Sequence, residues 1–210
     1  QPAKNYWSMS IGLLSLVLQK PGSRASQQST MITGDAMPAH MKLAAGSAFP
    51  RVPFATVAGG TFDFDAVQGW RLLVVYRGKH CPLCKVYLKS LDGMLEGFQE
   101  AGVTVAAVSA DPMEKAAADV AEFGWRFPVG YGLTIDQMRT LGLYVSEPRS
   151  AQETDRPFAE PGLFVLNPHG KIQIIDISNA PFSRPDLAAI LRGIKLIKER
   201  DYPIRGMMAA

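Results

Sequence analysis

Two cysteines at the junction of an apolar strand and an amphipathic helix constrain this chain more than any other feature of its sequence. Residues 72–76 form a continuous, valine-containing apolar run of strand length, which is typical of a strand buried on both faces. Cys81 and Cys84 follow this strand, and apolar residues then recur at helical spacing. The chain has only these 2 cysteines, too few for the disulfide framework of a small secreted domain. The pattern therefore indicates a chemical use for them.

The spacing of the two cysteines matches the first turn of a helix. Cys81 is the predicted N-cap, and Pro82 stands at the first helical position, where its missing N–H costs nothing. Cys84 then lies one turn further on, within reach of a disulfide. Unpaired N–H groups and the positive end of the helix dipole stabilise a thiolate at Cys81. We therefore expect Cys81 to be the nucleophile and Cys84 to be the resolving thiol.

Polar side chains just before the cysteines fit the same chemistry. Arg77, Lys79 and His80 supply positive or proton-accepting groups close to Cys81. An exposed histidine at the helix start, with no effect on the sulfur, is the alternative for His80.

Two other uses of a cysteine pair are weaker. In the first alternative the cysteines are buried structural residues, and in the second they are half of a zinc site. A zinc site needs two more ligands at ligand spacing. The candidates His40 and His169 are isolated in the sequence. We therefore expect redox chemistry and no metal.

The composition is that of one soluble globular domain with some length left for an arm. Of the 210 residues, 47% are apolar and 20% are charged. The 22 basic residues are spread along the chain, and the net charge is only +3. The sequence therefore lacks the clustered positive charge of a nucleic-acid-binding protein, and we expect no binding to DNA or RNA.

The N-terminal part differs in composition from the rest. Residues 9–18 are apolar but too few to span a bilayer, which takes about 20 residues, so we expect no membrane insertion. They are either the core of a secretory signal or an arm packed on the domain or on a partner subunit. Residues 19–40 are polar and aperiodic, as in a linker. We predict an N-terminal arm or linker over residues 1–42 and one domain over residues 43–210. The expected location is cytoplasmic, or periplasmic or secreted if the signal interpretation holds.

Strand and helix patterns alternate through the domain. The expected strands are residues 54–57, 61–64, 72–76, 103–109, 163–166 and 171–177, and the expected helices are residues 84–100, 112–123, 134–141 and a last one opened by residues 183–186. Asp111 is the predicted N-cap of the second helix, and residues 145–160 are predicted to be an exposed loop. This order predicts an α/β fold with a central mixed sheet, helices on both faces and an N-terminal hairpin extension.

These features resemble the thioredoxin-like superfamily and, within it, the peroxiredoxin-like proteins of the alkyl hydroperoxide reductase and thiol-specific antioxidant family. The resemblance covers about residues 43–200. It rests on Phe49-Pro50, the strand before Tyr76-Arg77-Gly78, Cys81-Pro82-Leu83-Cys84 and Pro161-Gly162-Leu163-Phe164-Val165. It implies a three-layer thioredoxin-like fold. It also implies that Pro161 occupies the position of a cis-proline facing the nucleophilic cysteine, the alternative being an ordinary proline before an edge strand.

The sequence departs from the family pattern before the cysteines. Typical members carry a proline seven residues and a threonine three residues before the peroxide-attacking cysteine. Counted back from Cys81, Val74 and Gly78 stand at these positions, and counted from Cys84, Arg77 and Cys81 do. The usual hydroxyl that orients the peroxide is therefore missing. The family's peroxide-binding arginine has no clear counterpart near the hairpin strand either.

Arg77 and Arg156 are the candidates to replace that arginine. The resemblance implies an antioxidant enzyme that reduces hydroperoxides through a Cys81/Cys84 dithiol–disulfide cycle. A thioredoxin- or glutathione-type reductant would regenerate it, no metal or organic cofactor is needed, and a homodimer is one expected form. The alternatives are a thiol–disulfide reductase without significant peroxidase activity and a non-catalytic thioredoxin-fold interaction module.

Overall fold

The computed structural model describes residues 42–208. The predictions for the arm, its apolar run over residues 9–18 and its linker fall outside these residues. Within residues 42–208, no helix has the length and apolar content that crossing a bilayer requires.

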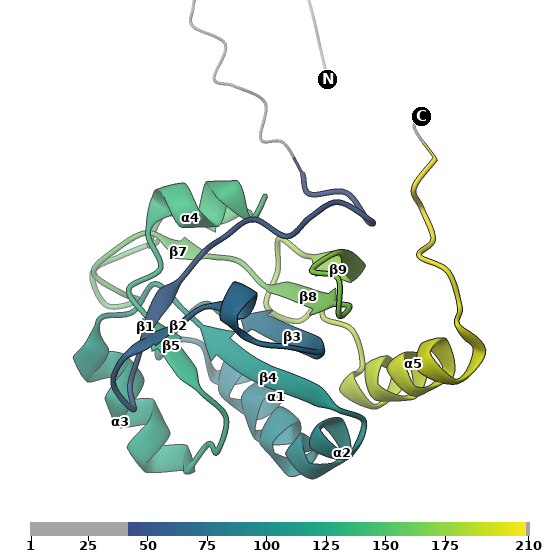
Figure 1. The fold of residues 1–210 in the computed structure, drawn as a ribbon. Coiled ribbons are helices and arrows are strands. Elements are labelled where there is room, and N and C mark those ends of the chain that lie inside the picture. The colour runs from purple at the N-terminus through teal and green to yellow at the C-terminus, as the bar shows by residue number, and fades with distance from the viewer. Residues whose placement is uncertain (1–41, 209–210) are drawn as a thin grey trace, which may run out of the picture. The chain divides into compact units, whose positions relative to one another are not determined.

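A seven-stranded mixed sheet lies at the centre of the domain (Figure 1), in the strand order β2-β1-β5-β4-β3-β8-β9. The strands are β1 (Phe54–Thr56), β2 (Thr61–Phe62), β3 (Trp70–Val75), β4 (Val103–Val108), β5 (Val129–Tyr131), β8 (Gly162–Leu166) and β9 (Ile172–Ile177). Strand β4 pairs parallel to both β3 and β5, whereas β8 pairs antiparallel to β3 and β9. The predicted mixed sheet and its β1–β2 hairpin are confirmed, and β5 is a strand that the sequence patterns did not predict.

Helices cover both faces of this sheet. They are η1 (Phe64–Ala66), α1 (Pro82–Gly93), α2 (Leu95–Glu100), α3 (Met113–Phe123), α4 (Ile135–Thr140) and α5 (Leu187–Arg200). Successive residues of β3 point to opposite faces, so Leu72 and Val74 pack with α1, α2 and α5, while Leu73 and Val75 pack with α4 (Figure 1). The predicted three-layer α/β architecture is confirmed.

One predicted helix is broken in two. Residues 84–100 were expected to be continuous, but α1 ends at Gly93, and Met94 separates it from α2. The Asp92 carbonyl, which a continuous helix would use as an acceptor, instead accepts a hydrogen bond from the Arg126 guanidinium at 2.8 Å. Glycine also weakens a helix at this point. The break therefore has a local and a tertiary cause.

The prediction that residues 145–160 form an exposed loop is wrong at both ends. Strands β6 (Val145–Ser146) and β7 (Phe158–Ala159) pair antiparallel in a separate small sheet. Phe158 is buried in the same core cluster as Val75, on the α4 side of the central sheet. Val145 and Phe158 are far apart in a mostly polar stretch. Apolar residues so widely spaced carry too little periodicity to reveal such short strands.

The last helix begins later than Ser183. Its N-cap is Asp186, whose side chain accepts a hydrogen bond from the Ala189 N–H at 2.7 Å. Pro185 disfavours helical backbone at the residue before it, which keeps Arg184 outside the helix. Residues 178–185 are consequently a non-helical connection from β9 to α5.

Close packing at β5 gives a testable prediction for the fold. An added Cβ at Gly130 would lie 2.9 Å from a methyl group of Val108 and would collide with the ring of Phe54. We expect Gly130→Ala to lower the free energy of unfolding by about 1–3 kcal/mol in urea titrations, as overpacked cores do. Gly193→Ala in α5, where a Cβ meets no atom within 4 Å, should instead raise it by about 0.5–1 kcal/mol. Equal stability of Gly130→Ala and wild type would contradict this packing.

Candidate active site

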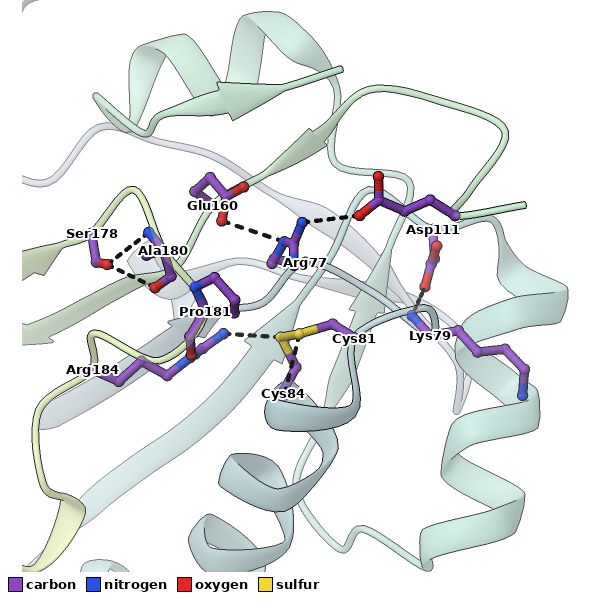
Figure 2. Close-up of a disulfide and its surroundings, with 11 residues drawn as sticks. Arg77, Lys79, Cys81, Cys84, Asp111, Glu160, Ser178, Ala180, Pro181 and Arg184 are labelled. Carbon is purple, nitrogen blue, oxygen red and sulfur yellow. Dashed lines mark hydrogen bonds and ion pairs between the residues drawn. A yellow bond between two sulfur atoms is a disulfide. The ribbon is translucent and has the colours of Figure 1, made fainter. Parts of the chain in front are cut away.

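The two cysteines lie at the start of α1, directly after β3 (Figure 2). Cys81 is the N-cap, and its Sγ accepts a hydrogen bond from the Cys84 N–H at 3.3 Å. Pro82 is the first helical residue. The cysteines form a disulfide with their Cα atoms 5.3 Å apart, within the ordinary range. The predicted capping arrangement is confirmed, whereas the roles of the two thiols remain predictions.

Both sulfur atoms are shielded from solvent. Cys81 is 2% exposed and Cys84 is 0% exposed, and both belong to the core cluster on the α1 side of the sheet. The surroundings are nevertheless not purely apolar, because a guanidinium group reaches one of the sulfurs. A reaction partner can reach the pair only if a covering segment moves.

Arg184 supplies this guanidinium group, and no sequence pattern predicted its place in the site. Its Nη2 donates a hydrogen bond to Cys84 Sγ at 3.1 Å, and its Nε donates to the Pro181 carbonyl at 3.2 Å (Figure 2). The group also stacks on the ring of Tyr87, 4.8 Å from its centroid. Burial lowers the pKa of Arg184 to about 10, so the side chain stays charged at neutral pH. A cation therefore lies against Cys84.

Arg77 lies in the same region but faces carboxylates (Figure 2). Its guanidinium group pairs with Glu153 and with Glu160, each at 3.3 Å, and lies over the ring of Phe158 at 4.6 Å. Arg156, the other candidate for the family's peroxide-binding arginine, pairs with the neighbouring Asp155 at 3.1 Å and 3.2 Å. Among the three arginines, Arg184 is the one that contacts a cysteine sulfur.

Gly78 and Lys79 are held by a buried carboxylate. The Lys79 N–H donates to Asp111 Oδ2 at 2.6 Å, and an added Cβ at Gly78 would lie 2.6 Å from the same atom. Gly78 also has a φ of 124°, a conformation that favours glycine. Asp111 was predicted to be the N-cap of α3, but that position is taken by Pro112. The Asp111 carboxylate binds the loop before Cys81 instead, and its burial raises its pKa.

His80 is half-buried against Phe158, with the ring centroids 4.6 Å apart. Within the described part of the chain, neither ring nitrogen has a hydrogen-bond partner. Burial, aided by the positive charge of Arg77, lowers the pKa of His80 to about 4. The histidine is therefore neutral at neutral pH and contributes no positive charge toward Cys81.

Pro161 lies at the same edge of the sheet as the cysteines. Strand register pairs Val75 with Gly162, so Pro161 directly precedes the residue opposite the end of β3. It is buried, and its carbonyl accepts a hydrogen bond from the Ser178 N–H at 3.0 Å. Its predicted role opposite the nucleophilic cysteine remains a prediction.

Among residues 42–208, no three His, Cys, Asp or Glu side chains are grouped so that they could hold an ion. The site itself is a disulfide at a helix start, following the buried β3 strand of a mixed sheet. This combination defines a thiol redox protein of thioredoxin-like fold.

The family model described as the AhpC/TSA family matches residues 45–175, and the chain belongs to that family. It is thus a peroxiredoxin-like enzyme. No curated protein matches the chain by sequence.

Solved structures of peroxiredoxins have the same fold. A cysteine-to-serine variant of peroxiredoxin 6 from Arenicola marina has a TM-score of 0.64 and 18% identity, covering 76% of each chain. The reduced 2-Cys peroxiredoxin of Plasmodium vivax has a TM-score of 0.64 and 17% identity, covering 76% of this chain and 84% of its own. AhpC of Mycobacterium tuberculosis has a TM-score of 0.63 and 15% identity, covering 77% and 96%. At these identities the likeness concerns the fold.

The clamp on the Gly78 loop can be tested by a double-mutant cycle. Asp111→Ala removes the acceptor of the Lys79 N–H and should cost about 1–3 kcal/mol of stability. Gly78→Ala brings its new Cβ against the carboxylate, so its cost should be smaller in the Asp111→Ala background. We expect a coupling of at least about 0.5 kcal/mol in urea unfolding. Costs that simply add would show that the two residues do not interact.

The pKa of His80 predicts a pH dependence of stability. The folded pKa of about 4 lies below the unfolded value of about 6.5, so the unfolded chain binds more protons between these pH values. Stability from the neutral ring is therefore complete above pH ~6.5 and is lost as the pH falls toward ~4. We expect urea midpoints of wild type to fall more steeply from pH ~7.5 to ~4.5 than those of His80→Phe, which keeps a ring against Phe158. Equal slopes would contradict the prediction.

Proposed function

We propose that this enzyme reduces hydroperoxides through a dithiol–disulfide cycle of Cys81 and Cys84. The observation that carries the proposal is the disulfide at the start of α1, where one sulfur accepts a backbone N–H and the other a guanidinium group. Both interactions favour a thiolate over a neutral thiol when the bond is reduced. Membership in the AhpC/TSA family supports peroxide as the oxidant.

The cycle balances without a cofactor. A thiolate attacks one peroxide oxygen, the O–O bond breaks, and the leaving alkoxide takes up a proton to form an alcohol. The resulting sulfenic acid is attacked by the second thiol, the S–O bond breaks, and water leaves as the disulfide forms. An external dithiol then returns two electrons and two protons.

The identity of the attacking sulfur depends on two competing interactions. The sequence predicts Cys81, whose Sγ lies at the helix start and accepts one backbone N–H. The contact between Arg184 and Cys84 favours the opposite assignment, because its donor carries a full positive charge, whereas the N–H that binds Cys81 Sγ is neutral. Cys84 is therefore the rival nucleophile.

Single-cysteine variants test both the activity and the assignment. Reduced wild type should consume one equivalent of hydrogen peroxide in stopped flow much faster than free cysteine does, and faster than it reduces a model disulfide. If Cys81 attacks, Cys81→Ser abolishes the reaction and Cys84→Ser limits it to a single turnover. The reverse pattern assigns the attack to Cys84. Rapid reduction of the model disulfide without peroxide consumption would establish the alternative, a thiol–disulfide reductase.

The pH dependence of alkylation provides an independent measurement on the same variants. We expect the attacking thiol to have a pKa well below the free-cysteine value of about 8.5. If the attacker is Cys84, Arg184→Gln should raise that pKa in the Cys81→Ser background, because it removes the charge beside the sulfur. An unchanged pKa would exclude Arg184 as the group that stabilises the thiolate.

A further inference from the structure

An apolar groove runs beside the disulfide, between α1 and the connection that leads into α5. Its lining includes Leu83, Val86, Tyr87, Met94, Pro181 and Phe182. Three of these side chains are unusually exposed for apolar residues, namely Leu83 at 48%, Val86 at 64% and Phe182 at 80%. Clustered exposed apolar side chains are typical of interaction sites.

The groove is continuous with the redox pair. Leu83 stands between the two cysteines in the sequence, and Arg184 lines the groove while its guanidinium group contacts Cys84 Sγ. Pro181 and Arg184 lie beside the disulfide in Figure 2. A molecule bound in the groove therefore touches the groups that shield the sulfur.

The chemistry of the groove selects among possible reductants. Of its lining residues, only Arg184 and Asp186 are charged, and the Arg184 guanidinium group is already engaged by Cys84, Pro181 and Tyr87. Glutathione is a small, charged tripeptide, and it would find few partners on such a surface. A protein whose reactive thiol is surrounded by apolar surface is complementary to this groove. Such a protein also has enough contact area to displace the connection between β9 and α5.

We propose that this groove docks the protein dithiol that regenerates the Cys81–Cys84 disulfide, an inference that rests on the proposed function. A thiolate of the reductant attacks one sulfur, the Cys81–Cys84 bond breaks, and the other cysteine leaves as a thiolate. The second thiol of the reductant then attacks the mixed disulfide. The reductant departs oxidised, and both cysteines take up protons as thiols.

Charge insertion into the groove tests the proposal. The preoxidised protein is reduced in a single turnover, either by a bacterial thioredoxin kept reduced with its reductase and NADPH or by dithiothreitol. Val86→Glu and Phe182→Glu should each lower the second-order rate constant with thioredoxin at least tenfold and change that with dithiothreitol less than twofold. Ile135→Glu, a matched change at an exposed apolar residue of α4, should leave both rate constants unchanged.

Several outcomes would overturn the proposal. Unchanged thioredoxin rates, equal losses with both reductants, or the same loss with reduced glutathione would each show that the groove does not select a protein reductant. Wild type could also sediment as a dimer and the Val86→Glu and Phe182→Glu variants as monomers, with unchanged rate constants for thioredoxin. That result would assign the groove to contact between copies of this chain. Because the assay begins with oxidised protein and uses no peroxide, its result is distinguishable from failure of the peroxidase activity.

Discussion

The site depends on one constraint, the start of α1 immediately after the buried strand β3. Strand β3 is fixed by parallel pairing with β4 and antiparallel pairing with β8, so the chain leaves the sheet at a defined point. The Asp111 carboxylate then binds the Lys79 N–H and fills the space that a side chain at Gly78 would need. Cys81 consequently reaches the N-cap position, where the first turn of the helix brings Cys84 within bonding distance.

Electrostatics around the disulfide are divided between two arginines. Arg184 contacts Cys84 directly, and because the arginine is half-buried, solvent screens the contact only in part. Arg77 forms ion pairs with Glu153 and Glu160, so its charge is neutralised locally. The same ion pairs link the β6–β7 region to the segment before the cysteines. The charge of Glu160 also raises the pKa of Arg184, partly offsetting the effect of burial. Of the two arginines, Arg184 is therefore the one whose charge lies against the sulfur.

The sequence predicted the parts of the site that are local in the chain. The run before the cysteines, Pro82 and the helical spacing after it are encoded within residues 72–100, so periodicity and capping rules suffice. Arg184 lies 100 residues from Cys84, and no local pattern distinguishes it from other arginines. Asp111 has the sequence pattern of a helix N-cap. This pattern does not reveal that its carboxylate binds the Lys79 N–H instead. Strand β5 was missed because its three residues are too few to show a period.

Burial of a reactive disulfide must be reconciled with turnover, and the connection between β9 and α5 contributes Arg184 to the surroundings of the sulfur. Thiol–disulfide exchange requires direct access to a sulfur atom. Helix α1 cannot move aside to give this access, because its residues Leu88 and Leu91 are fully buried in the core. In the connection, Phe182 is largely exposed. The contacts of the connection to α1 include the hydrogen bond that the Tyr87 hydroxyl donates to the Pro185 carbonyl and the one that Arg184 donates to Cys84 Sγ. Arg184 contacts the sulfur only while the connection lies over α1. Displacing the connection would therefore remove the cation from the sulfur.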